Sequence, residues 1–352
     1  MMNCGYTIIL DDMRLLKQEN IPYEKMRNKT ILVTGATGML AAYVVHFCMY
    51  LNETEGYGIR VLALVRNKEK ALEKFSKYEN DSNFEFLVQD VCDEIRYDGR
   101  IDYIIHAAGN ASPRYILDDP VGIIKANTIG TMNVMELARK NSGVRVVYTS
   151  TREVYGKMLD NVEAIEEDIF GCLDPMERRA CYPESKRIAE SILKSYYYQF
   201  GVESVVLRIA HSYGPGMIIN NDGRVMADFI SDVVNERNIV LKSTGDAVRA
   251  FCYITDAVSA MFLTMLNSPS GEAYNVANER EPKPIREVAQ MLVRLFPERK
   301  LKVIFDIPEQ MSLGYSKMGR TVLSTKKIED LGWTPKVCLA EGMKKTVLSF
   351  AN

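Results

Sequence analysis

A loop with two glycines, placed between a strand-like run and an apolar helix-like run, restricts the fold of this chain more than any other feature. Residues 30–34 indicate a buried strand, and residues 41–50 have the length and apolar content of a helix. Between them, Gly35 can take the positive φ of a tight turn, Gly38 lets the backbone approach a ligand, and Ala41 keeps the helix close to its strand. The free N–H groups in the first turn of such a helix attract phosphate, so the loop predicts a dinucleotide-binding site.

Strand-like and helix-like segments alternate from residue 29 onward, which is typical of βαβ units in a parallel sheet. We therefore predict an α/β fold, a Rossmann doubly wound parallel sheet with a smaller C-terminal α/β substrate lobe. The expected elements are strand 31–33, helix 41–50, strand 61–65, a helix from Lys68, strands 84–88 and 101–105, helix 121–139, strand 144–148, helix 182–200 and strand 205–207.

Three regions are expected along the chain. Residues 1–28 form an N-terminal lead-in, in which a charged amphipathic helix ends before Ile21 and Pro22. Residues 29–210 form the NAD(P)-binding Rossmann domain. Residues 211–352 form mostly the substrate-binding lobe, with some segments returning to the core.

Composition favours a small-molecule ligand. The chain has 352 residues, of which 47% are hydrophobic, and a formal net charge of −2 with its basic residues spread along the sequence. These values give no electrostatic footprint for nucleic acid or an anionic membrane. The first ten residues have no basic region leading into an apolar one, and no apolar stretch approaches the roughly 18 residues that a membrane span needs. We expect a cytoplasmic protein.

The cysteines and histidines predict neither disulfides nor a metal site. Seven cysteines are scattered without CxxC spacing, and an odd number cannot all pair within one chain. We expect them to be reduced and mostly buried. The three histidines, His46, His106 and His211, form no metal-ligand pattern.

Tyr182 and Lys186 are four residues apart, so on a helix both side chains project from one face. A nearby ammonium favours the phenolate, so we expect Lys186 to lower the pKa of Tyr182 and also to hold a nicotinamide ribose. Tyr182 would then exchange a proton with an alcohol. Thr151 and Glu153 follow the expected strand 144–148, where Thr151 can hydrogen-bond the reacting hydroxyl and Glu153 can act as a second acid or base. The alternatives are a solvated Lys186 on a surface helix, and a Thr151 and Glu153 that only cap a turn.

From residue 29 to the C-terminus, the chain resembles the extended short-chain dehydrogenase/reductase family of nucleotide-sugar enzymes, the NAD-dependent epimerases and dehydratases. Within that family it is most similar to UDP-glucuronate decarboxylases. The segments that carry the resemblance are the loop 34–41, Asp90-Val91, His106-Ala107-Ala108, Ala111-Ser112-Pro113, Asn127, Thr151, Arg179-Ala180-Cys181-Tyr182, Lys186 to Glu190, Arg208, Tyr213-Gly214-Pro215, Asp222 to Val225, Arg249-Ala250-Phe251 and Leu331-Gly332-Trp333.

The resemblance implies a site for tightly bound NAD(P), a nucleotide-sugar substrate and a homodimer. The implied catalytic residues are Thr151, Tyr182, Lys186 and Glu153. The expected cofactor-binding residues are Gly35, Thr37, Gly38, Met39, Leu40, Arg66, Asp90, Val91, Ala107, Ala108, Asn127 and Lys186, and the expected substrate-binding residues are Ser112, Arg152, His211, Arg224 and Arg249.

Three departures from the family pattern affect the predicted chemistry. Arg66 stands at the end of the second strand, where an acidic residue usually binds the adenosine 2′-hydroxyl, and a cation there favours NADP over NAD. His211 stands where the decarboxylases have Asn. Arg152 stands where the decarboxylases have Ser and the 4,6-dehydratases have Asp.

Oxidation of the sugar at C4 gives a ketone with several fates. A C6 carboxylate makes it a β-keto acid that loses CO₂, a C6 hydroxyl allows elimination of water, and return of hydride to the other face gives the C4 epimer. Arg152 cannot supply a proton at neutral pH, which disfavours 4,6-dehydration. We therefore predict a decarboxylase-like enzyme of the UDP-glucuronate type first and a 4-epimerase second. A non-catalytic NAD(P)-binding module is the alternative from another class.

Overall fold

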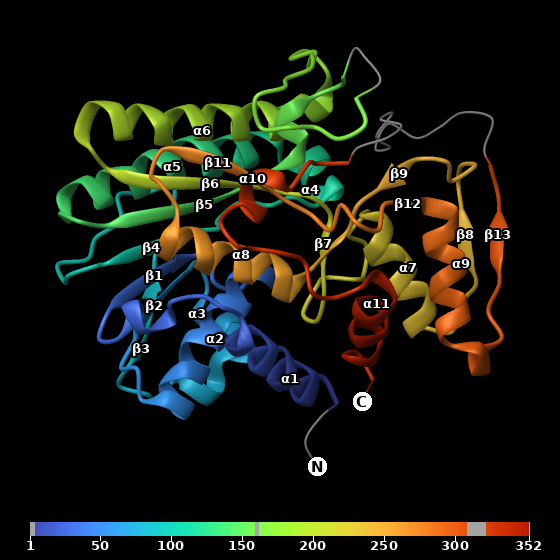
Figure 1. Cartoon of the computed structure of the whole chain (residues 1–352), viewed down its shortest axis with the longest axis horizontal. Helices are drawn as coiled ribbons and strands as arrows, with labels where there is room; N and C mark the ends of the chain where they lie inside the picture. The colour runs from blue at the N-terminus through green and yellow to red at the C-terminus, as the bar shows by residue number, and fades with distance from the viewer. Residues whose placement is uncertain (1–3, 159–161, 308–321, 352) are drawn as a thin grey trace.

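The computed structural model of the chain describes residues 4–158, 162–307 and 322–351. At its centre is a sheet of seven parallel strands in the spatial order β11-β6-β5-β4-β1-β2-β3, with helices on both faces (Figure 1). The predicted doubly wound α/β fold is confirmed. The strands are β1 (Thr30–Thr34), β2 (Arg60–Val65), β3 (Phe84–Val88), β4 (Tyr103–His106), β5 (Arg145–Thr151), β6 (Glu203–Ile209) and β11 (Glu272–Val276).

The sheet is buried on both sides, as parallel sheets are. Along β1, Ile31 and Val33 belong to one apolar cluster and Leu32 to the other, because successive side chains of a strand point to opposite faces. One face is covered by α5 (Pro120–Lys140) and α6 (Cys181–Phe200). The other is covered by α2 (Met39–Glu55), α3 (Lys68–Phe75) and α8 (Ile254–Asn267).

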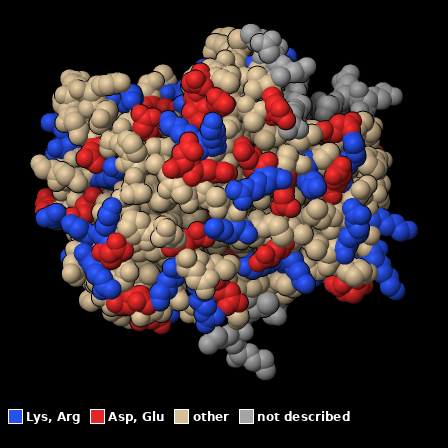
Figure 2. Space-filling model, viewed as in Figure 1, with Lys and Arg blue, Asp and Glu red and all other residues tan. Residues whose placement is uncertain are grey.

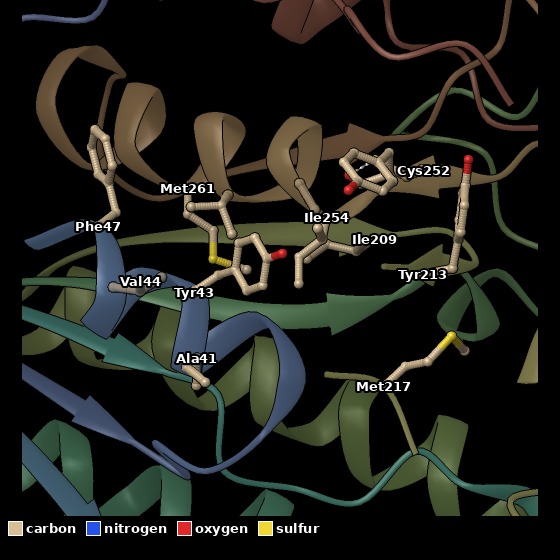
Figure 3. Close-up of a cluster of buried hydrophobic side chains, with 14 of the residues drawn as sticks. Ala41, Tyr43, Val44, Phe47, Ile209, Tyr213, Met217, Cys252, Ile254 and Met261 are labelled. Atoms are coloured by element: carbon tan, nitrogen blue, oxygen red, sulfur yellow. Dashed lines mark hydrogen bonds between the residues drawn. The ribbon is translucent and has the colours of Figure 1, made fainter. Parts of the chain in front are cut away.

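The core between α2 and α8 fixes the glycine loop relative to the end of β6. Tyr43 and Phe47 of α2 are directed toward α8, where Met261 lies in the same cluster (Figure 3). The rings of Phe47 and Phe262 have centroids 5.2 Å apart. Ile209, the last residue of β6, lies in this cluster. The packing therefore fixes the start of α2, and with it the glycine loop, relative to the end of β6.

A smaller lobe lies to the right of the sheet in Figure 1. In it, β8 (Ile239–Leu241) pairs in parallel with β13 (Val303–Phe305), and β9 (Val248–Arg249) pairs antiparallel with β12 (Lys283–Pro284). Its helices include α7 (Val225–Val234), α9 (Ile285–Leu295) and α11 (Leu339–Leu348), and β7 (Ser212–Tyr213) pairs with β10 (Cys252–Tyr253) beside it. Two elements from residues 211–352, α8 and β11, are part of the main sheet and its cover.

The N-terminal segment is a helix that docks on the core. It is α1 (Cys4–Gln18), which ends ahead of Ile21, as the sequence predicts. Asp12 on this helix is fully buried and accepts hydrogen bonds from the hydroxyls of Tyr43 (3.0 Å) and Tyr253 (2.8 Å). Lys345 of α11 lies 3.3 Å from the same carboxylate. The helix therefore connects α2, β10 and the C-terminal helix.

The prediction that the cysteines are mostly buried is wrong. The six cysteines whose side chains the structure describes are unpaired, but only Cys48 and Cys252 are buried, whereas Cys172 and Cys338 are exposed and the other two are intermediate. Cys172 and Cys338 lie in connecting segments outside the strands and helices, where backbone runs over the surface.

Surface charge, helix length and the arrangement of potential metal ligands add three facts. Basic and acidic side chains are interspersed over the face shown in Figure 2. None of the helices in the described ranges is long and apolar enough to cross a membrane. Within those same ranges, no group of three or more His, Cys, Asp or Glu side chains could hold a metal ion.

Candidate active site

The glycine loop joins β1 to α2 at the carboxyl edge of the sheet. Gly35 has a φ of 61°, and a Cβ atom there would lie 2.8 Å from the Cα atom of Ala108. Gly38 precedes α2, its carbonyl accepts the N–H of Ala42 at 2.8 Å, and no side chain in the described residues caps the helix. The first N–H groups of α2 are thus oriented for an anion, which fits a pyrophosphate. The other loop residues predicted to bind cofactor, Thr37, Met39 and Leu40, lie in this turn.

A pocket of about 760 Å³ lies at the carboxyl ends of β2 and β3 and is lined by Arg66 and Asp90. The carboxylate of Asp90 accepts the N–H of Cys92 at 2.9 Å, which holds the turn after β3. Val91 packs against α5, where a Cβ atom at Gly130 would lie 2.9 Å from its Cγ1 atom. The structure therefore brings Arg66 and Asp90 to one pocket, where an adenosine would fit, whereas Val91 is buried and is not among the residues that line it. Asp93 and Glu94 line the same pocket, so charges of both signs face it.

A chain of hydrogen bonds connects the end of β1 with α5. The Thr34 hydroxyl accepts the N–H groups of residues 107 and 108 (3.2 and 3.1 Å) and lies 2.8 Å from Nδ1 of His106. The Nε2 atom of His106 is 3.1 Å from the Thr131 hydroxyl, which donates to the carbonyl of Asn127 at 2.5 Å. Burial lowers the pKa of His106 to about 3, so the imidazole is neutral and its single proton is assigned to Nε2. The chain fixes Asn127 relative to the glycine loop.

The side chain of Asn127 presents an unsatisfied acceptor to the site. Its Nδ2 atom donates to the Ser185 hydroxyl at 2.9 Å, whereas its buried Oδ1 atom has no hydrogen-bond partner in the described part of the chain. A Cβ atom at Gly109 would lie 2.7 Å from Oδ1 and 3.7 Å from Nζ of Lys186, so only glycine leaves this space open. Buried acceptors are rarely left unpaired, and this one, beside an amine, fits the hydroxyls of a ribose.

Tyr182 stands in the first turn of α6 and faces the end of β5. It is hydrogen-bonded to Thr151, the last residue of β5, and both side chains are buried. Lys186, one turn along α6, donates to the carbonyl of Thr149 at 2.8 Å, and its Nζ atom lies 4.5 Å from the centroid of the Tyr148 ring. The structure therefore brings together three of the four residues predicted to perform catalysis, and Lys186 is buried rather than solvated on a helix surface.

The predicted direction of the Tyr182 pKa is wrong for the chain by itself. Burial and the nearby Glu153 raise the pKa of Tyr182, whereas the hydrogen bond from Thr151 and the more distant arginines lower it by less. Burial lowers the pKa of Lys186 to about 7, because a buried ammonium loses its hydration. The spacing of the two residues was visible in the sequence, but the depth at which both are buried was not.

Two buried arginines lie close to each other near the end of β5, and one of them, Arg152, lies near Tyr182. Burial lowers the pKa of Arg152, and Glu153, Arg179 and Tyr182 are the charged or titratable groups that act on it. Burial and the neighbouring Arg152 lower the pKa of Arg249 to about 10. The η3 turn (Arg152–Tyr155) carries Arg152 directly after β5, and β9 carries Arg249. Two cations at this end of β5 favour an anionic group of a substrate.

The remaining predicted substrate residues lie around this centre. The buried Ser112 hydroxyl donates to the carbonyl of Asp222 at 2.7 Å, and Arg224 pairs with the Asp222 carboxylate. Arg224 is close enough to Tyr182 to lower its pKa, which places this turn next to the site. His211 follows β6 and lies close enough to Arg152 that the guanidinium lowers its pKa.

A sequence model of the NAD dependent epimerase/dehydratase family matches residues 31–277, from β1 to just beyond β11. The matched range contains the glycine loop, Thr151, Tyr182 and Lys186. The chain belongs to this family. The resemblance that the motifs indicated is therefore confirmed.

Individual proteins that the chain is similar to carry more specific names. UDP-glucuronic acid decarboxylase 6 of Arabidopsis thaliana is 33% identical over 317 residues, which are 90% of this chain and 87% of that protein. The structure of UDP-glucose 4-epimerase from Thermotoga maritima, with UDP-glucose, superposes with a TM-score of 0.77 at 25% identity over 91% of this chain and 98% of that one. UDP-glucuronic acid 4-epimerase from Bacillus cereus, in complex with UDP-glucuronic acid and NAD, shares the fold with a TM-score of 0.73 at 20% identity, over 90% and 98% of the two chains.

The sequence reasoning assigned no role to Arg179, which the structure places in the site. Its Nη2 atom donates to Glu153 at 2.8 Å, so it holds the carboxylate that was predicted to act as acid or base. One indication of this role was visible in the sequence, which is that Arg179 lies three residues before Tyr182. In the structure it lies on the η4 turn (Arg178–Ala180) that leads into α6. Gly109 was missed as well, because a single glycine after a strand carries no pattern of its own.

Proposed function

We propose that this chain oxidises C4 of a uronic-acid nucleotide sugar, with UDP-glucuronate as the substrate, and that the resulting β-keto acid loses CO₂. The observation that supports the proposal is a pair of neighbouring buried arginines at the end of β5, of which Arg152 lies near Tyr182 and Arg249 lies near Arg152. Cations at that position attract the C6 carboxylate and leave C4 near the phenol oxygen. The 33% identity to a UDP-glucuronic acid decarboxylase over 90% of the chain supports the same substrate.

The side chains of the site take distinct roles in this proposal. Thr151 hydrogen-bonds the C4 hydroxyl and orients it toward Tyr182, which takes its proton as C4 is oxidised. A nicotinamide cofactor, when bound, supplies hydride acceptance and return. After the oxidation, the C5–C6 bond breaks, its electron pair moves onto C5 and the C4 oxygen as an enolate, and CO₂ departs. In this proposal Glu153, held by Arg179, passes a proton taken up from solvent to C5, and Tyr182 gives its proton back to the C4 oxygen as the ketone is reduced.

We propose NADP as the cofactor, with its pyrophosphate bound by the loop that contains Gly35 and Gly38. Lys186 and the unsatisfied Oδ1 atom of Asn127 suit the hydroxyls of the nicotinamide ribose. Arg66, at the end of β2, suits a 2′-phosphate because its guanidinium is exposed in the adenosine pocket. The carboxylates that line the same pocket repel a 2′-phosphate. The preference for NADP over NAD therefore depends on Arg66.

A C4 epimerase acting on the same substrate is the second candidate, and Arg152 is the observation that favours it. A guanidinium that pairs tightly with the C6 carboxylate stabilises the carboxylate before the reaction, which opposes its loss as CO₂. The ketone is then reduced from its other face and the carboxylate is kept. Simple 4,6-dehydration fits less well, since Arg152 replaces the acid that would protonate the leaving hydroxyl.

A homodimer through α5 and α6 is proposed for the assembly. These neighbouring helices expose large apolar side chains, among them Ile124, Ile129 and Met132 on α5 and Ile188 on α6. An exposed apolar patch of this kind marks an interaction surface. Sedimentation of the purified protein at micromolar concentration tests this, and a monomer there would contradict it.

The test of the reaction is to add UDP-glucuronate to the cofactor-loaded protein and to follow the absorbance of reduced nicotinamide within one turnover. The proposal expects transient reduction with UDP-glucuronate. A non-catalytic cofactor-binding module would show no reduction with UDP-glucuronate, UDP-glucose or any other nucleotide sugar of a panel. Reduction with UDP-glucose alone would contradict the proposed uronic-acid substrate.

A further inference from the structure

A second pocket, of about 400 Å³, lies between α1, α2 and the η2 turn (Ser76–Tyr78), and we refer to it as the α1 pocket. Within the described parts of the chain it shares no lining residue with the adenosine pocket, and Thr151, Tyr182 and Lys186 do not line it. One of its walls, α1, lies outside residues 31–277, the range that the family model matches. Its volume is in the range of about 300–1,000 Å³ that small-molecule sites have, so it is a separate candidate site.

The walls of the α1 pocket are mainly aromatic and apolar. Its described lining includes one histidine, four tyrosines and two methionines, which are His46, Tyr6, Tyr43, Tyr50, Tyr78, Met13 and Met39. The Nδ1 atom of His46 is 3.0 Å from the Tyr78 hydroxyl, and the centroids of the two rings are 5.7 Å apart. Burial lowers the pKa of His46 to about 4, so the imidazole pairs with Tyr78 in its neutral form. Ring faces of this kind suit an aromatic ligand, which packs against them offset or edge-on.

Lys74 is the cation in the α1 pocket that suits an anionic group. Lys77, the other lysine in the described lining, pairs with Glu53 at 2.8 Å. The Nζ atom of Lys74 donates instead to an uncharged acceptor, the carbonyl of Thr37, at 2.8 Å. Burial lowers the pKa of Lys74, and the neighbouring Glu73 raises it by less. An ammonium has three N–H groups, so a carboxylate in the pocket can bind Lys74 and replace the hydration that burial removes.

Lys74 also connects the α1 pocket with the glycine loop. Thr37 lies between Gly35 and Gly38, and Met39, the first residue of α2, lines the pocket. A carboxylate is a stronger acceptor than a peptide carbonyl, so an anion bound in the pocket draws the ammonium of Lys74 away from Thr37. Loss of that contact loosens the loop whose geometry fits the pyrophosphate of the cofactor.

We propose that the α1 pocket is a regulatory site for a small aromatic carboxylic acid, and that the bound acid weakens cofactor binding by drawing Lys74 away from Thr37. The aromatic lining binds the ring of the acid, and Lys74 binds its carboxylate. Because coupling between two binding sites is reciprocal, the cofactor weakens binding of the acid by the same factor. The inference concerns cofactor binding alone and does not depend on the proposed sugar substrate or reaction.

The test uses naphthylacetate as the probe and naphthylacetamide as its uncharged counterpart. Calorimetric titrations measure the binding of both compounds to the cofactor-free protein, and then its affinity for NADP and NAD at increasing concentrations of each compound. The titrations are repeated with Lys74→Met, which keeps an unbranched side chain without the ammonium, and with Lys74→Arg, which keeps a cation. Arg66→Met is the matched control, because it removes a cation from the adenosine pocket. Circular dichroism checks that each variant is folded.

We expect the parent protein to bind naphthylacetate at least about tenfold more tightly than the amide, the difference typical of one hydrogen bond to a charged group. Saturating acid should weaken cofactor binding about fivefold and then have no further effect, because both ligands occupy the protein together. Arg66→Met should leave the affinity for the acid unchanged, and Lys74→Arg should retain most of it. Lys74→Met should bind acid and amide equally, and its cofactor affinity should no longer respond to the acid.

Four results would overturn the inference. The first is equal binding of acid and amide to the parent protein, or no binding of either, and the second is a preference for the acid that survives in Lys74→Met. The third is a cofactor affinity that keeps falling as the acid concentration rises, or a loss of acid binding in Arg66→Met, since either result places the acid in the adenosine pocket. The fourth is a cofactor affinity that does not change when the acid is bound.

Discussion

Replacing Gly35 by alanine should destabilise the protein and disrupt cofactor binding. Gly35 has a φ of 61°, and an added Cβ atom would lie 2.8 Å from the Cα atom of Ala108 and 3.0 Å from two further backbone atoms of residues 107 and 108. The left-handed conformation costs an alanine about 1–2 kcal/mol. Overpacking against rigid backbone adds about 1–3 kcal/mol, so the expected loss in the free energy of unfolding is about 2–5 kcal/mol.

Gly56 is a matched control for this substitution. It has the same φ of 61° at the end of α2, but an added Cβ atom there meets no heavy atom within 4 Å. Gly56→Ala should therefore lose only the conformational part, about 1–2 kcal/mol. The difference between the two variants isolates the contact of the glycine loop with the segment after β4.

Denaturant unfolding followed by the fluorescence of the buried Trp333 measures both losses, and calorimetry measures the cofactor affinity of both variants. Gly35→Ala should bind NADP and NAD at least about tenfold more weakly, because the loop must move away from residue 108. Gly56→Ala should bind them normally. Equal losses of stability in the two variants, or unchanged cofactor affinity in Gly35→Ala, would refute the reasoning.

Three further substitutions test individual residues. Tyr182→Phe should keep the fold and cofactor affinity but lower kcat at least about 100-fold, because only the ionisable hydroxyl is lost; retention of most of the activity in a steady-state assay would remove Tyr182 from the mechanism. Arg66→Asp should weaken NADP binding more than NAD binding in calorimetric titrations, and an equal loss for both would count against a 2′-phosphate contact. Lys186→Met should raise the free energy of unfolding most at about pH 6, because Lys186 is then charged in both the folded and the unfolded state and its charge is buried on folding. The gain should shrink as the pH rises from about 7 toward 10.5, because Lys186 is then neutral in the folded state. A gain that does not depend on pH would contradict the lowered pKa of Lys186.

The strand-loop-helix order could be predicted because local patterns carry it. The apolar runs around the glycine loop correspond to β1 and α2, and the long helix that begins near Tyr182 is α6. The carboxyl ends of parallel strands share one edge of a sheet, so residues that are distant in sequence meet there. Arg66 and Asp90 lie in one pocket for this reason.

The burial of individual side chains, and contacts between residues that are far apart in the sequence, could not be predicted in the same way. The pKa values of Tyr182 and Lys186 follow mainly from burial, which is produced by packing of the whole domain. The role of Arg179 depends on its contact with Glu153, 26 residues earlier, across a segment without a readable pattern. Asp12 gave no signal either, because its partners Tyr43 and Tyr253 come from elements far apart in the chain.

The most direct test of the proposed reaction is incubation of the cofactor-loaded protein with UDP-glucuronate labelled at the C6 carboxyl carbon. The account predicts that the label is released as CO₂ and that a UDP-pentose accumulates. Label retained in a new isomer would contradict decarboxylation and support C4 epimerisation. An unchanged substrate and cofactor would contradict UDP-glucuronate as the substrate.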